Sequence, residues 1–164
     1  TSTSYGERID QVLVMVANTW YYRPVICRTD SVAVNWDPSL FTFQHGSFSL
    51  NCYGKLNDGT VVLYDSTDDI AESEQGAIGY YVSLNEVLNS YVSVESLGMF
   101  ILEPAQYIYK VSTGLSPSIN ADYVHSKNPL GIPASFDPIG TGLAIDMGAL
   151  CDNCATGANL YYKK

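Results

Sequence analysis

The residues of this chain that are best suited to chemistry gather in its C-terminal half. Asp122, Tyr123 and His125 place a carboxyl, a phenol and an imidazole within four positions. They follow a turn-rich loop at 112–120, and the β-branched and aromatic run 107–111 before that loop predicts a core strand. Loops that leave a rigid strand often carry functional side chains. We therefore expect these three residues to form one wall of a site.

Two other sets of charged residues are candidates. Glu72 and Glu74 are one residue apart and could act as paired catalytic carboxylates, but the acidic stretch around them favours a solvated loop. Arg28 is one of only three arginines in the chain. It could hold an anionic substrate by charge-assisted hydrogen bonds, or it could form a structural salt bridge with Asp30.

The elements that must position these side chains are predicted to be short strands and helices. Asn57-Asp58-Gly59 before an apolar run is typical of a hairpin turn. Asp37 followed by Pro38 is typical of a helix start. The segment 5–17 fits an amphipathic helix and a strand equally well. The predicted elements are strands at 25–30, 79–84, 107–111 and 143–147, a hairpin at 55–64, and short helices at 37–46 and 85–96.

Composition restricts the fold class and the partners. The chain has 164 residues, of which 46% are hydrophobic and 15% charged, so one globular domain with its own core is expected. The formal net charge is -9, with only eight lysines and arginines, which disfavours nucleic acid and anionic membranes as partners. No apolar run is long enough to cross a bilayer as a helix. A protein or glycan partner is expected instead.

Four cysteines bear on the cellular compartment. Their even number, together with few lysines and many tyrosines, predicts a secreted protein with two disulfide bonds. Three pairings are open; we expect Cys27–Cys52 and Cys151–Cys154, with crossed pairing as the alternative because a C-x-x-C bridge closes a strained loop. A metal site is not expected from one C-x-x-C and two histidines. A cysteine hydrolase is disfavoured because disulfide bonds leave no thiolate.

Three segments, in order, resemble the ADP-ribosyltransferase subunits of the cholera, heat-labile enterotoxin and pertussis toxins. The first is Cys27-Arg28-Thr29-Asp30-Ser31, which is similar to the strand end Tyr-Arg-x-Asp-Ser of that family. The second is Tyr80-Tyr81-Val82-Ser83-Leu84, which is similar to its Tyr-Val-Ser-Thr-Ser. The third runs from Tyr107-Ile108-Tyr109 through Asn120-Ala121-Asp122 to Gly131-Ile132-Pro133.

This resemblance implies a fold and a reaction. The fold would be α+β, with two small mixed or antiparallel sheets around a cleft, short flanking helices and disulfide bonds. The similarity covers residues 25–162, so the chain is expected to be a single domain with an N-terminal extension at 1–24. The reaction of the family cleaves the bond between nicotinamide and ribose in NAD, which would be a substrate, and no cofactor would be required.

The resemblance also assigns roles by position. Arg28 would hold the diphosphate of NAD through charge-assisted hydrogen bonds. Ser83 would support the ribose and the catalytic carboxylate by hydrogen bonding. Asp30 and Tyr123 would border the bound NAD. The transition state is similar to an oxocarbenium ion, so a carboxylate facing the ribose stabilises it more than the ground state.

The family's catalytic Glu-x-Glu is the main departure, because Tyr123 and His125 occupy those two positions. Histidine can donate a hydrogen bond but cannot supply a fixed negative charge beside the ribose. Asp122 is the candidate substitute acid, although its side chain would point to the opposite face of an extended chain. Glu72 and Glu74 are further candidates for that acid.

Three functions are therefore compatible with the sequence. The first is a secreted, toxin-like effector that keeps the transferase fold, lacks transferase activity and acts by binding a partner. The second is an active mono-ADP-ribosyltransferase with a rearranged acid. The third is a secreted β-rich domain outside that family, which binds protein or carbohydrate and uses aromatic side chains as stacking platforms. The aromatic candidates for that role are Trp20, Tyr21, Tyr22 and Trp36.

Overall fold

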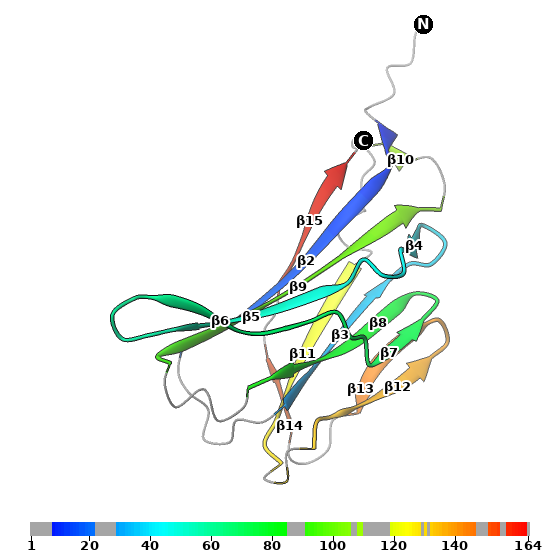
Figure 1. Cartoon of the computed structure of the whole chain (residues 1–164). Helices are drawn as coiled ribbons and strands as arrows, with labels where there is room; N and C mark the ends of the chain where they lie inside the picture. Colours follow the sequence, from blue (N-terminus) through cyan, green and yellow to red (C-terminus); the bar gives the residue numbers. More distant parts are fainter. Residues whose placement is uncertain are drawn as a thin grey trace, which may run out of the picture.

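A computed structural model of the chain is a sandwich of two antiparallel sheets (Figure 1). In sheet 1 the strands lie in the order β15-β2-β9-β5-β6, and β4 also pairs with β9. Its strands are β2 (Gln11–Trp20), β4 (Phe41–Phe43), β5 (Ser49–Lys55), β6 (Val61–Thr67), β9 (Ser93–Pro104) and β15 (Gly157–Lys163). The structure describes residues 8–21, 29–84, 91–105, 108–109, 119–128, 130, 132–146, 151–154 and 157–163.

Sheet 2 has the strand order β14-β11-β3-β8-β7. Its strands are β3 (Thr29–Trp36), β7 (Glu72–Glu74), β8 (Ala77–Ser83), β11 (Ile119–Ser126) and β14 (Cys151–Cys154). Two short pairs complete the described strands: β12 (Ser135–Ile139) with β13 (Gly142–Asp146), and β1 (Arg8–Ile9) with β10 (Ile108–Tyr109).

One hydrophobic core fills the space between the two sheets. Alternate residues of each strand point into it, as the period of two in a strand requires. From β2 these are Val12, Val14 and Val16, and from β3 they are Val32 and Val34, all fully buried. The two sheets therefore bury their facing surfaces against each other and do not border a cleft.

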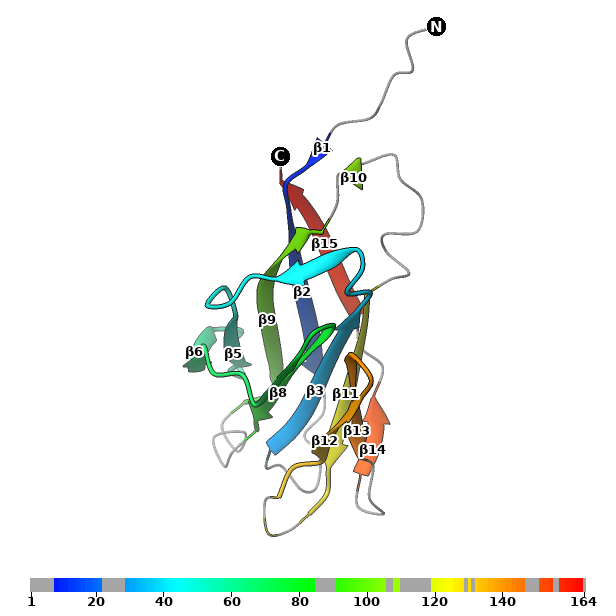
Figure 2. The same cartoon turned by 90° about the vertical axis from the view of Figure 1, so that its right-hand side faces the viewer.

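The hairpin β12–β13 lies on the other side of sheet 2 (Figure 2). Phe136 and Leu143 of the hairpin pack on Ala33 and Ala77 of the sheet in a second apolar cluster. Small residues allow this approach: a Cβ atom on Gly79 would lie 2.8 Å from the Phe136 ring. The hairpin thus covers the part of the outer face of sheet 2 around Ala33 and Ala77.

The prediction of an α+β fold is wrong, since the described part of the chain contains strands and no helix. The expected helix at 37–46 is a turn followed by β4, in which Leu40 and Phe41 donate hydrogen bonds to the Asp37 carbonyl. Of the expected helix at 85–96, residues 85–90 lie outside the described residues and the C-terminal part begins β9. Among the described residues no helix could span a membrane.

The outcome of the strand predictions varies: of 107–111 only 108–109 are described, in the short strand β10 outside both main sheets, and of 25–30 only 29–30 are described, at the start of β3. The hairpin at 55–64 is confirmed: Leu56 donates a hydrogen bond to the Thr60 carbonyl, and Gly59 takes a φ of 90° in the turn. The strands predicted at 79–84 and 143–147 correspond to β8 and β13. The segment 5–17, open between helix and strand, supplies β2 in the middle of sheet 1.

The predicted disulfide bonds are wrong as well. Cys52 is a free, buried thiol facing the core, and burial together with Asp65 raises its pKa to about 11. Cys151 and Cys154 are the ends of the extended strand β14. Three residues of strand span about 10 Å, well beyond the ~6 Å between the Cα atoms of a disulfide. Cys27 lies outside the described residues, and secretion stays a prediction.

Candidate functional site

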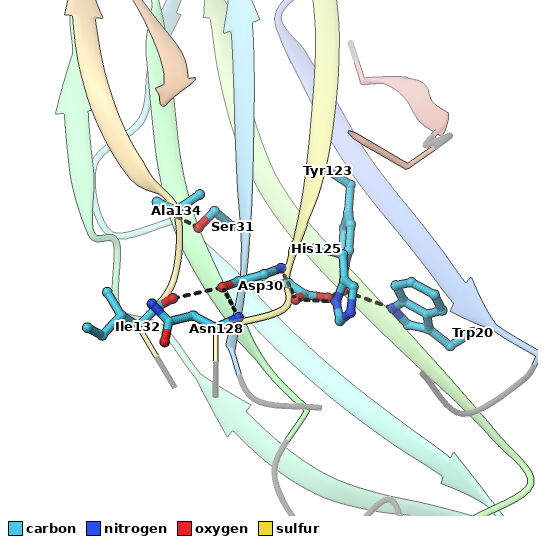
Figure 3. A network of polar contacts seen from close by, with 9 residues as sticks. Trp20, Asp30, Ser31, Tyr123, His125, Asn128, Ile132 and Ala134 are labelled. Carbon is cyan, nitrogen blue, oxygen red and sulfur yellow. Dashed lines mark hydrogen bonds and ion pairs between the residues drawn. The ribbon is translucent and has the colours of Figure 1, made fainter. Parts of the chain in front are cut away.

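Three of the predicted site residues meet in one buried network at an end of the core (Figure 3). The Asp30 carboxylate accepts three hydrogen bonds. Its Oδ2 atom accepts from the Tyr123 hydroxyl at 2.5 Å, and its Oδ1 atom lies 2.8 Å from Nδ1 of His125 and 3.1 Å from the backbone nitrogen of Ser126. When the Asp30 carboxylate is ionised it only accepts, and Nδ1 of His125 is then the donor of this contact.

Strand register explains why these residues meet. Val124 of β11 lies opposite Ser31 of β3, and Tyr123 lies opposite Val32. Asp30 and His125 are each one position further along their strands, on the inner face of sheet 2. From sheet 1, the Trp20 indole donates a hydrogen bond of 3.1 Å to the Tyr123 hydroxyl and lies edge-on to the His125 ring at 5.0 Å.

Burial determines what this network can do. Asp30 is 0% exposed, Tyr123 1% and His125 4%, so an NAD ribose has no access to the carboxylate or the imidazole. A His–Asp pair can orient a general base, but that base must also contact a nucleophile or a substrate proton. Among the described residues, no hydroxyl or thiol is hydrogen-bonded to the other ring nitrogen of His125. The network therefore has a structural role: its buried polar groups form hydrogen bonds with one another at the end of the core.

The other predicted site residues lie apart from this network. Asp122 is exposed on the outer face of sheet 2, opposite Ala33, because neighbours in a strand point to opposite faces. Ser83 ends β8 opposite Thr29, and its carbonyl accepts a hydrogen bond of 3.0 Å from the Tyr64 hydroxyl. Arg28 lies outside the described residues. The candidate acid and the serine therefore do not join Asp30 and His125.

Other candidate groups are also distributed over the molecule. Glu72 and Glu74 lie in β7, the last strand of sheet 2. The predicted aromatic platform is not formed: Trp36 is buried in the core and Trp20 is held in the network, which leaves Tyr21 exposed. Tyr22 lies outside the described residues. No cluster of three or more metal-ligating side chains occurs in the described part of the chain.

A second feature, which the sequence interpretation missed, is the outer face of sheet 1. Residues paired across neighbouring strands share a face, so the register identifies what lies there. Leu13 pairs with Ile101, Met15 with Met99 and Ala17 with Leu97, all partly exposed. Tyr53 of β5 pairs with Leu63 of β6, and Val61 follows on the same face. We call these nine residues the apolar band: Leu13, Met15, Ala17, Tyr53, Val61, Leu63, Leu97, Met99 and Ile101.

The apolar band lies on the far side of the sheet from the core, and no strand that the structure describes lies over it (Figure 1). The sequence carried a signal for it. In 12–16 and 97–102 apolar residues occupy both sets of alternate positions, whereas a strand with one face in water alternates apolar and polar residues. That unbroken pattern is typical of a strand covered on both faces.

Comparison with known proteins adds no assignment. No protein-family model matches the chain, no curated protein is detectably similar to it, and no solved structure matches it.

Proposed function

We propose that this protein acts by binding another protein through the apolar band on sheet 1. The observation that carries the proposal is the band itself, on a face opposite the core. Six of its apolar side chains pair across β2 and β9, and three more continue on β5 and β6, with Ser49, Asn51 and Glu95 on the same face between the two groups. Contiguous exposed apolar surface of this kind marks interaction sites in soluble proteins. The predicted role as a binding protein is thereby kept, without the transferase fold.

Charge suggests the chemistry of the partner. The chain carries a formal net charge of -9. On the face of the band, Glu95 and Glu103 of β9 are exposed, with Lys55 of β5 at one end. Complementary potentials steer association and suppress wrong partners. The partner we propose is therefore apolar at its centre and basic around it, and a second copy, which is equally acidic, fits less well.

The size of the face suits such an interface. Five strands at a spacing of ~4.8 Å and the 12 residues of β9 at ~3.3 Å each give a face of at most about 950 Å². Stable protein interfaces bury about 800 Å² on each partner. The outer face of sheet 1 is therefore large enough for one stable protein contact.

A random 12-residue peptide display library tests the proposal against purified protein. We expect selection on the wild type to enrich peptides that combine apolar residues with lysine or arginine. Their affinity should fall at least 10-fold for Met99→Glu, which places a charge at the centre of the band. The matched control is Ile139→Glu, because Ile139 is 62% exposed on the β12–β13 hairpin. This control should bind as the wild type does.

Two results would overturn the proposal. One is a library that yields no binding peptide, and the other is a set of peptides that bind Met99→Glu and the wild type equally. Sedimentation of the wild type decides the identity of the partner. A dimer that Met99→Glu dissociates would show that a second copy occupies the band and would exclude a basic partner.

A further inference from the structure

The apolar band ends on an open edge of sheet 1. β6 is the last strand in the sheet, and among the described strands it pairs only with β5. Its first three residues are unusually exposed for their type: Val61 is 61% exposed, Val62 36% and Leu63 52%. The band therefore continues onto a strand whose outer backbone N–H and C=O groups have no strand partner in the described part of the chain.

The bulge in the β5–β6 pairing and Asp65, which pairs with core-facing Cys52, protect only the second half of the β6 edge and leave Val61, Val62 and Leu63 open. Natural edge strands carry lysine or proline, which prevent the addition of another strand. The sequence of β6, Val-Val-Leu-Tyr-Asp-Ser-Thr, contains neither. Val61 and Leu63 lie on the outer face, whereas Val62 pairs with buried Gly54 and lies on the inner side. An added strand would thus find apolar contacts on both faces of its backbone.

We infer that the edge of β6 accepts an extended segment of the partner as an added antiparallel strand. This inference rests on the proposed function and states how the partner binds. Main-chain hydrogen bonds to β6 supply affinity, and alternate side chains of the segment supply specificity. On the outer face, those side chains extend the apolar band by one strand. All described pairings in sheet 1 are antiparallel, which gives the direction of the added strand.

Acidic residues at both ends of β6 define the charge of the segment. Asp58 precedes the strand in the exposed turn, and Asp65 lies within the strand after its apolar residues. Asp68 and Asp69 follow it and are exposed. The occupant is accordingly a segment with alternating apolar residues flanked by lysine or arginine.

Self-pairing of β6 is disfavoured by the same charges. An antiparallel pair of two β6 strands centred on Val62 would place Asp65 of each copy opposite Gly59 of the other. Asp58, Asp65, Asp68 and Asp69 of each copy would then lie along the same shared edge, where like charges repel, whereas a segment flanked by lysine or arginine meets opposite charge. The partner segment, and not a second copy, is therefore the occupant that the charges favour.

Two N-methylated peptides make the test specific for strand addition. The parent probe is acetyl-Lys-Lys-Val-Thr-Val-Thr-Val-Lys-Lys-amide. One derivative carries N-methyl groups on its valines and the other on its threonines. In an added strand, alternate N–H groups face β6 and the others face solvent. We expect one derivative to lose at least 10-fold in affinity and the other to bind as the parent does.

Variants of the protein complete the experiment. The double variant Val61→Lys/Leu63→Lys should weaken the parent peptide at least 10-fold, while Ile139→Lys on the hairpin should have no effect. Equal binding of both derivatives, or full binding to the double variant, would overturn strand addition. So would a parent peptide that does not bind. If strand addition is overturned in this way, weaker binding of the displayed peptides to Met99→Glu would still support binding through the apolar band. The two proposals can therefore be refuted independently of each other.

Discussion

The two outer faces of the sandwich differ in what the chain does with them. On sheet 2, small residues line the face and the β12–β13 hairpin covers them; Ala33 and Ala77 are fully buried there. On sheet 1, the central positions carry large side chains such as Leu97 and Met99, and no described strand covers them. Figure 2 shows the hairpin in front of sheet 2, with sheet 1 behind.

The outer face of sheet 2 around Ala33 and Ala77 is buried when the chain folds, whereas the outer face of sheet 1 would be buried only when a partner docks on it. Where the hairpin comes closest to sheet 2 the covered residue is small, since a Cβ atom on Gly79 would clash with the Phe136 ring. A face that a partner covers needs large apolar side chains, which supply contact area. The apolar band has the second composition, so its residues should contribute to binding and little to stability.

The largest expected effect comes from one substitution made on both faces. Ala33→Glu buries a charge beneath the hairpin and should cost about 3–5 kcal/mol of unfolding free energy, as an unpaired buried charge does. Ala17→Glu, in the apolar band, leaves the new carboxylate in contact with water and should cost less than about 1 kcal/mol. Urea denaturation of both variants gives the comparison.

The outcome of this pair decides whether the faces differ. Similar costs for Ala17→Glu and Ala33→Glu would mean that sheet 1 is covered as fully as sheet 2 in the isolated protein. The apolar band would then be core, and no partner would be needed to explain it.

The Asp30 network provides a reference for a polar residue buried by folding. Asp30→Ala would leave the Tyr123 hydroxyl, His125 and the Ser126 N–H without their acceptor. We expect a cost of about 2–4 kcal/mol, since a buried donor left unpaired costs ~1–3 kcal/mol and these losses are only partly additive. Thermal denaturation followed by tryptophan fluorescence measures it.

The matched control for that network is Asp122→Ala, which removes an exposed carboxylate from the same sheet. It should change stability by less than about 0.5 kcal/mol. A small cost for Asp30→Ala would contradict the structural role of the network.

The sequence predicts those parts of the fold that depend on neighbouring residues, and not those that depend on contacts between distant residues. Asn57-Asp58-Gly59 predicted its hairpin correctly, because a glycine with positive φ is a local requirement of that turn. β2 could not be assigned, because apolar residues at both alternate sets of positions hide the period of two. An Asp-Pro pair such as Asp37-Pro38 occurs both at the start of a helix and in a tight turn. Tertiary contacts therefore determine which of the two structures forms.

For the site, the sequence interpretation named residues that do lie together in the structure, but it did not predict the role that they have there. Tyr123 and His125 were predicted to share a site with Asp122, but they instead form one network with Asp30, which was predicted only to border NAD. Their burial depends on register between β3 and β11 and on Trp20 from the opposite sheet, which are long-range facts absent from any local pattern. The apolar band was missed because it exists only once β2, β9, β5 and β6 are placed side by side.

A smaller effect should follow from releasing the hairpin that covers sheet 2. The Asn35 side chain donates a hydrogen bond of 2.9 Å to the Leu143 carbonyl and accepts one of 2.8 Å from its N–H. Asn35→Ala should cost about 1–2 kcal/mol and speed amide exchange in β12–β13 more than elsewhere. Asn51→Ala is the control, because Asn51 only accepts a hydrogen bond from exposed Ser66. Uniform exchange after Asn35→Ala would show that the hairpin does not open as a separate unit.

The smallest expected effect on stability, and the most informative one for function, is that of Met99→Ser. Met99 pairs with Met15 and Ser49 on the outer face, so a serine there loses partly exposed contacts and buries no new polar group. The cost in urea denaturation should be below about 1 kcal/mol, within the range of surface substitutions. Peptides selected on the wild type should nevertheless bind at least 5-fold more weakly. A substitution that weakens binding but leaves stability unchanged identifies a docking face. A substitution in the core would lower stability as well. A large stability loss with unchanged binding would place Met99 in the core and refute the contrast between the two faces.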